Sequence, residues 1–242
     1  MDLPHYHRCH RQIDPQLSYE LAINENPRNA TASTGGHGKR GVAGSRCLWQ
    51  PGRTLWISFV GAPDRNLKMA IFELASQWTD LSEANIEFDL AENNDLRAQI
   101  RILTETQSLY SESAIGTDSL APTEASMVLN VKPDHKDFQA IVLHEFGHAL
   151  GMDHEHQHPE ANIPWNEPAL RLYHEMLGWS DHEIDHNFFN KRTEDMIKTA
   201  YDPTSIMHYS VPKAWTWGEE IGINHELSEK DLEFMRLAYP HG

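Results

Sequence analysis

The chain has 242 residues, and its 36 acidic and 20 basic side chains give a formal charge of -16 at pH 7. This surplus of negative charge repels phosphate backbones and anionic lipid surfaces, so we expect neither nucleic-acid nor membrane partners. The longest apolar runs are too short to span a bilayer, and no apolar signal core follows Met1, which favours a cytoplasmic over a secreted protein. The length suits one catalytic unit with a buried core, and we expect a monomer.

The sequence contains 16 histidines but only two cysteines, Cys9 and Cys47. One optional disulfide is no framework for a secreted scaffold, so we expect two thiols. Neutral imidazole is the commonest metal ligand in proteins, and the histidine excess therefore directs attention to metal sites.

Residues 1–45 differ from the rest of the chain in their pattern. They have no sustained apolar period, and a Gly-rich stretch runs from Thr34 to Gly41. We interpret them as an N-terminal arm or pro-segment. The packed domain is expected to begin near Leu48.

Short apolar runs predict strands and one helix in the first half of that domain. Alternation over residues 55–59 predicts the first strand. Apolar residues then recur at helical spacing from Leu67 to Trp78, after a start signal at Pro63-Asp64. Three further strands are expected over residues 86–90, 99–103 and 127–131, so the sequence predicts a sheet of four to five strands.

The second half begins with an apolar helix and continues with irregular chain. The helical pattern from Phe138 to Ala149 stops at Gly151, the residue type that most readily takes the left-handed position after a helix. Residues 152–204 are rich in His, Pro, Trp and Asn and have poor periodicity, with one short helix expected over 168–177. They are typical of a loop-rich subdomain.

The chain closes with a helix expected from Leu227 to about Tyr239. Ser228 and Asp231 stand at the spacing of a capping box, in which each side chain accepts a backbone N–H of the other residue. Helices and strands that are mixed in this way along the chain predict an α+β protein.

Five residues with metal-site chemistry lie in the stretch His-Glu-Phe-Gly-His-Ala-Leu-Gly-Met-Asp-His: His144, Glu145, His148, Gly151 and His154. At about 3.6 residues per turn, His144 and His148 share one helix face, and Glu145 lies beside them rather than among the ligands. Gly151 allows a sharp turn that brings His154 back as a third ligand. Three neutral histidines leave a fourth position for water, which is typical of one catalytic Zn²⁺.

This stretch resembles the extended zinc motif of the metzincin metallopeptidases, which is followed downstream by a methionine-containing turn. The candidate turn is Ser-Ile-Met-His-Tyr at residues 205–209, and it looks most like the turn of the astacin family. The resemblance implies that Met207 packs beneath the zinc. It also implies that Tyr209 is an additional, displaceable zinc ligand that can stabilise an oxyanion. His-Glu-His-Gln at residues 154–157 is similar to a microbial subgroup of that family.

The resemblance covers about residues 46–240 and implies the metzincin fold. A twisted mixed sheet with the active-site helix would form an upper lobe over 46–151. A loop-rich lower lobe would follow over 152–240, with the zinc cleft between the lobes. The segment Ser126–Leu129 stands where the family has the edge strand that pairs with extended peptides.

The function implied is a zinc-dependent endopeptidase acting on peptide or protein substrates. Glu145 would accept a proton from the attacking water as general base and pass it to the leaving amine. Two alternatives remain open: a zinc hydrolase specialised for one peptide-like metabolite, and a zinc-loaded protein that binds peptides without cutting them. The presence of Glu145 argues against the second, because a pure binder has no need of that base.

Some residues have two interpretations. A cluster in the arm could be a latency device, with the Cys9 thiolate on the open zinc position as in some metzincins, or a set of incidental residues: His5, His7, Cys9 and His10. Glu155 could hydrogen-bond a ligating histidine or form a salt bridge. His156 and His158 are interpreted as loop residues, because the motif already fills the protein positions on the metal.

Overall fold

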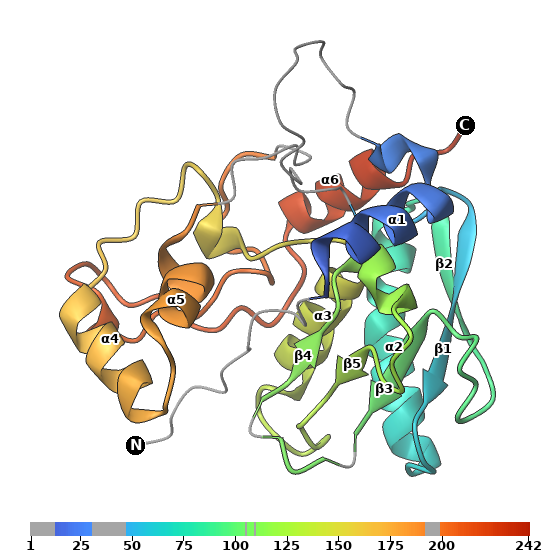
Figure 1. Ribbon diagram of the computed structural model, residues 1–242, viewed down its shortest axis with the longest axis horizontal. Helices are drawn as coiled ribbons and strands as arrows, with labels where there is room; N and C mark the ends of the chain where they lie inside the picture. The colour runs from blue at the N-terminus through green and yellow to red at the C-terminus, as the bar shows by residue number, and fades with distance from the viewer. Residues whose placement is uncertain (1–12, 31–46, 105, 109, 192–198) are drawn as a thin grey trace.

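The computed structural model describes residues 13–30, 47–104, 106–108, 110–191 and 199–242. In Figure 1 the sheet lies on the right with helices α1, α2, α3 and α6, and helices α4 and α5 lie on the left. The helices are α1 (Pro15–Glu25), α2 (Arg65–Ser82), α3 (Phe138–Ala149), α4 (Glu167–Met176), α5 (Asp181–Ile184) and α6 (Glu229–Ala238). The strands are β1 (Arg53–Phe59), β2 (Ile86–Leu90), β3 (Ile100–Leu103), β4 (Glu112–Ser113) and β5 (Met127–Val128). The α+β class with a five-stranded sheet is confirmed.

The sheet is mixed, with strand order β2-β1-β3-β5-β4. Strands β1, β2, β3 and β5 run parallel to one another, and β4 pairs antiparallel with β5. The expectation that Ser126–Leu129 forms the edge strand is wrong, because β5 is flanked on both sides. The edge on that side of the sheet is β4, whose two residues are too few to show an alternating pattern in sequence.

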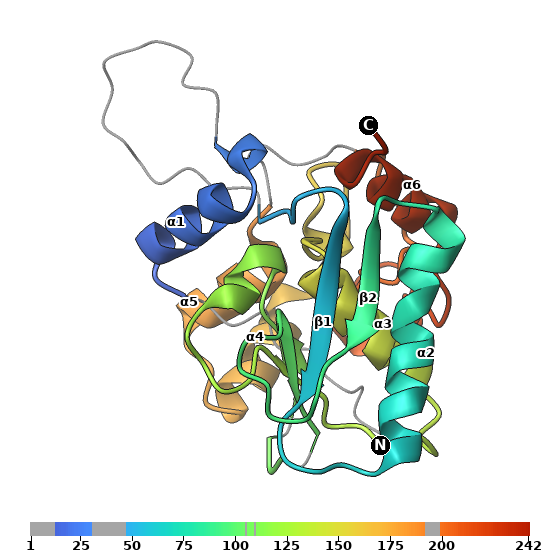
Figure 2. The same ribbon diagram turned by 90° about the vertical axis from the view of Figure 1, so that its right-hand side faces the viewer.

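Helix α2 forms where the apolar period from Leu67 to Trp78 predicts a helix. It begins two residues earlier and ends four residues later than that pattern. The Asp64 carboxylate accepts the backbone N–H groups of Asn66 and Leu67, which caps the first turn. Figure 2 shows α2 along one side of strands β1 and β2, with α1 on the other side. The buried Trp78 of α2 donates its indole N–H to the Leu143 carbonyl of α3 at 3.0 Å. This bond connects two helices of the core.

Helix α3 lies in the middle of the hydrophobic core, and nearly all its residues are buried. Its C-terminal carbonyls find partners from distant parts of the chain: Trp49 donates its indole N–H to Ala149 at 2.8 Å, and the Tyr239 hydroxyl donates to Leu150 at 2.7 Å. The last carbonyls of a helix have no intrahelical donor, and each such buried bond contributes about 0.5–1.5 kcal/mol. The C-terminal end of α3 is therefore fixed by one residue from the beginning of the domain and one from its end.

The described part of the arm, residues 13–30, contains a helix that its sequence pattern does not predict. Only Ala22 of α1 is fully buried, so there is no apolar stripe to recognise. Polar side chains fasten this segment instead. The Asn26 amide donates to the Trp49 carbonyl at 3.0 Å, and the Asn29 amide donates to the Leu48 carbonyl at 2.7 Å. The histidine and cysteine cluster around Cys9 lies outside the described residues.

The Cys47 thiol lies at the contact between α1 and the domain, beside Ser18 and Asp118. Burial, followed by the charge of Asp118, raises the pKa of this thiol from 9.0 to about 12. Since only the thiolate attacks disulfide reagents, a raised pKa makes this thiol less reactive at pH 8 than it is in the unfolded chain.

We therefore expect a Cys9→Ser variant to react with an aromatic disulfide reagent about 10³-fold more slowly when folded than in urea. The rate should increase about tenfold per pH unit between pH 8 and 11, because the thiolate fraction does so below the pKa. Thiol absorbance kinetics measure both. Equal rates for the native and the urea-unfolded variant would contradict the assignment.

The lower half holds a second, smaller core: Leu170, Ile184, Phe188, Tyr209, Val211 and Trp215. The short helix expected over 168–177 is present as α4. Helix α5 continues into one π-helical segment, Asp185–Phe189, which the sequence pattern does not indicate.

The capping box of α6 is confirmed, with Ser228 and Asp231 each accepting a backbone N–H of the other. Among the described residues, no helix combines the length and the apolar character needed to cross a bilayer.

Candidate metal centre

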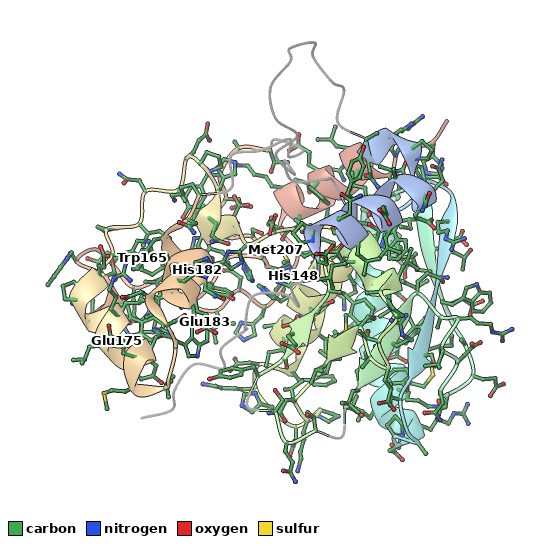
Figure 3. All side chains as sticks on the ribbon, in the orientation of Figure 1. His148, Trp165, Glu175, His182, Glu183 and Met207 are labelled. Carbon is green, nitrogen blue, oxygen red and sulfur yellow. The ribbon has the colours of Figure 1, made fainter. Side chains whose placement is uncertain are left out.

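Three histidines converge between the two halves of the molecule. His144 and His148 lie one turn apart on α3, and His154 follows the turn after that helix. One ring nitrogen from each of the three lies within 4.8 Å of the others, and all three side chains are buried. Figure 3 shows His148 at this junction, next to Met207. The structure thus brings together the three histidines that the sequence predicts as ligands.

Backbone carbonyls orient two of the rings. Nδ1 of His144 lies 2.9 Å from the Ile206 carbonyl, and Nδ1 of His148 lies 2.8 Å from the Met152 carbonyl. A carbonyl only accepts, so each Nδ1 carries the proton and each Nε2 presents a lone pair. Nε2 of His148 lies 2.9 Å from Nε2 of His154. Neutral imidazole nitrogens are common zinc ligands, so this donor set of three convergent imidazoles fits Zn²⁺.

Gly151 makes the turn that returns the chain to the site. Its φ is +91°, in the region that costs other residues steric strain. The Met152 N–H donates back to the Gly147 carbonyl at 3.0 Å, which closes the end of the helix. The turn places the Met152 carbonyl against His148 and delivers His154 two residues later.

Glu145 is completely buried, one residue after His144. Burial raises the pKa of its carboxyl group to about 8, and the charge of Glu112 on strand β4 adds to the rise; a protonated His148 would act in the opposite direction. A carboxylate in such surroundings accepts a proton more readily than one in water. Strand β4, which carries Glu112, contacts helix α3 and so lies close to this side of the site.

The turn at residues 205–209 passes under the cluster. Met207 is fully buried, and the Tyr209 ring contacts the His154 ring with centroids 4.2 Å apart. The Asp231 carboxylate of α6 fixes this turn by accepting the Ser205 hydroxyl at 2.6 Å and the Ile206 N–H at 2.9 Å. The Ile206 carbonyl in turn orients His144, so the closing helix supports this member of the histidine cluster through two hydrogen bonds in series.

A family profile described as Astacin, a peptidase family, matches residues 63–240, well over half of the chain. The chain belongs to the astacin family. Among solved structures, myroilysin matches with a TM-score of 0.70 and 33% sequence identity, covering 81% of this chain and 97% of that one. High choriolytic enzyme 1, a hatching enzyme zinc-protease from Oryzias latipes, matches with a TM-score of 0.56, 19% identity and coverage of 80% and 94%. The second likeness concerns the fold alone.

The curated relatives of this astacin-family chain are much longer proteins. Meprin A subunit alpha of Rattus norvegicus is 35% identical over 77 residues, which make up 30% of this chain and 9% of that protein. Meprin A subunit beta of the same organism is 27% identical over 139 residues, or 52% of this chain and 18% of that protein. The matched regions thus span less than a fifth of either relative's length.

Two further residues near this astacin-family site, Glu155 and His156, have partners that the sequence pattern does not indicate. Glu155 accepts the Asp202 N–H at 2.8 Å, and burial raises the pKa of its carboxyl group to about 7. His156, interpreted from sequence as a loop residue, is buried against Tyr209. No local signal marks that contact, because its partner lies more than fifty residues downstream.

Gly147 in the zinc-motif helix of this astacin-family chain is required by close packing. A Cβ atom there would lie 2.3 Å from the Met207 sulfur and 3.0 Å from the Trp78 ring. Gly147→Ala is therefore expected to lower the unfolding free energy by about 1–2 kcal/mol, since overpacking outweighs the helical preference of alanine. Zinc affinity should fall as Met207 shifts. Urea unfolding and zinc titration measure the two effects.

Gly222→Ala is the control for this substitution, because nothing lies within 4 Å of the added methyl group. It should leave both quantities unchanged. A Gly147→Ala protein that is as stable as the parent and binds zinc equally well would show that Met207 yields without cost.

Proposed function

We propose that this chain is a zinc-dependent endopeptidase with one catalytic ion held by His144, His148 and His154. The observation that carries the proposal is the convergence of three oriented imidazoles beside a buried carboxylate, Glu145, that is not one of the three. A structural zinc site uses all four positions for protein side chains and has no need of such a base. Membership of the astacin family supports the same reaction.

The metal would supply Lewis acidity, which polarises a peptide carbonyl and lowers the pKa of water. Glu145 takes the proton from the attacking water and passes it to the leaving amine, so that one carboxyl group serves as base and then as acid. Its burial favours the protonated form that the second step needs. The Nδ1–H bonds of His144 and His148 to carbonyls maintain the ring orientation throughout.

Tyr209 is proposed as a fourth, displaceable ligand. Its ring centroid lies 4.2 Å from that of His154 and 6.0 Å from that of His144, so the phenol belongs to the same cluster of rings. After displacement by substrate, the hydroxyl group would donate a hydrogen bond to the developing oxyanion. Tyr209 would thus take part in metal binding before the reaction and in catalysis during it.

Strand β4 is the proposed platform for extended peptides. It is the antiparallel edge of the sheet, and it contacts helix α3, which carries Glu145. A sheet edge binds a peptide by main-chain hydrogen bonds with little dependence on sequence. We further propose residues 46–240 as the catalytic domain, with 46–151 above and 152–240 below the cleft, and residues 1–45 as a pro-segment.

The test is cleavage of a peptide library by the zinc-loaded full chain, with and without a chelator. The proposal predicts chelator-sensitive cuts inside peptides, restored by added zinc. Binding of peptides without cleavage would favour a non-hydrolytic binding protein. Cleavage of one small peptide-like compound alone would favour a specialised hydrolase.

A further inference from the structure

His156 is completely buried, two residues after the third zinc ligand. Its ring stacks on the Tyr209 ring, with centroids 4.3 Å apart and planes inclined by 19°. The His154 ring touches both, at 4.2 Å from Tyr209 and 5.3 Å from His156. The three rings form a triangle of mutual contacts, and His156 gives Tyr209 a flat support that is not part of the metal site.

The His156 ring is itself fixed by the lower core. Its Nε2 lies 2.8 Å from the Asn187 carbonyl, and since a carbonyl only accepts, Nε2–H is the donor. Asn187 belongs to the π-helical segment Asp185–Phe189. The neighbouring Gln157 amide donates to the His186 carbonyl at 2.7 Å and to the Asn190 carbonyl at 2.9 Å. Two successive side chains thus attach this loop to the π-helical segment, a type of local distortion that is frequent at functional sites.

We infer that His156 is a positioning residue for Tyr209: its anchored ring holds the phenol against the three-histidine cluster. The inference rests on the role of Tyr209 in the proposed function. A ring held in one plane returns to the same place after each displacement, whereas an unsupported ring has many orientations to search. Stacked aromatic pairs differ from equal apolar contact by a few-fold to about tenfold in an equilibrium constant.

Four variants test this: His156→Ala, His156→Leu, His156→Phe and His158→Ala. Phenylalanine keeps the stacked ring, leucine keeps the bulk without the ring, and alanine removes both. His158 is the matched control, because it lies in the same segment but stacks on a different tyrosine, Tyr201. We expect kcat to fall about tenfold with alanine or leucine and less than threefold with phenylalanine, with KM changing less than kcat. His158→Ala should match the parent.

The same changes in a Tyr209→Phe background decide whether His156 acts through the phenol. There, His156→Leu should have no further effect on kcat. A readout without turnover is the tyrosinate-to-Cu²⁺ charge-transfer absorption of the copper-substituted chain. This band should vanish in Tyr209→Phe, weaken or shift in His156→Leu, and persist in His156→Phe and His158→Ala.

The outcomes separate this inference from the proposed function. If the parent cleaves no peptide but the copper band depends on His156 as described, the positioning role stands and the peptidase proposal fails. If the parent cleaves peptides and His156→Leu has the same effect with and without the Tyr209 hydroxyl, His156 is merely a core residue and the inference fails. Circular dichroism shows whether each variant folds. If His156→Ala does not fold, the comparison of His156→Leu with His156→Phe tests the inference.

Discussion

Glu145→Gln is expected to lower kcat/KM for peptide hydrolysis by about 10²–10⁴-fold while zinc stays bound. Glutamine has nearly the same shape, so the completely buried site need not rearrange, but its amide cannot accept and return a proton. The three histidines that would hold the metal are untouched. Metal analysis of the purified variant and steady-state kinetics on a peptide cleaved by the parent measure the two quantities.

The chain offers a matched control for this substitution. His182-Glu183-Ile184-Asp185-His186 repeats the same His-Glu-x-x-His pattern on α5 and the π-helical segment. There, Glu183 accepts the Ser180 N–H as part of a capping box, a role that glutamine can also fill. Glu183→Gln should keep full activity. Near-parental hydrolysis by Glu145→Gln, in a preparation free of other proteases, would rule out Glu145 as the base.

The repeated pattern also explains what made the metal site predictable. The rings of His182 and His186 lie parallel with centroids 6.4 Å apart, whereas those of His144 and His148 are 4.8 Å apart. Five letters do not distinguish the two places. Only the first segment is followed by Gly151 and His154 at fixed offsets. Both residues lie within a few positions of the end of the same helix, so local sequence rules are enough to recognise them.

The elements that were missed depend on contacts between distant parts of the chain. Strand β4 has only two residues and is defined by its pairing with β5. Helix α1 is attached by Asn26 and Asn29 rather than by an apolar face. The stacking of His156 on Tyr209 joins two segments of the lower half, and neither segment has a periodic pattern. Such polar and aromatic contacts carry no repeat that a sequence window could detect.

Asp231→Ala is expected to lower the unfolding free energy by about 2–5 kcal/mol, the largest stability effect we predict. The Asp231 side chain is buried and accepts three hydrogen bonds, from the Ser205 hydroxyl and from the N–H groups of Ile206 and Ser228. Alanine leaves these three donors without the carboxylate. Burial raises the pKa of this carboxyl group, and its hydrogen bonds act in the opposite direction. Urea unfolding measures the change.

Asp231→Ala should also weaken zinc binding. A change in zinc affinity would show that Asp231 supports the turn at residues 205–209 and does not merely cap helix α6. Ser228→Ala removes the hydroxyl that caps α6 but retains the Asp231 carboxylate, so it should cost only about 1 kcal/mol and leave zinc affinity unchanged. The expected loss of zinc affinity in Asp231→Ala has a structural reason. Asp231 accepts the N–H of Ile206, and the carbonyl of the same residue orients His144. Equal zinc affinity in the two variants would mean that the turn keeps its place without α6. The three-histidine cluster would then depend on its own helix and on the Gly151 turn alone.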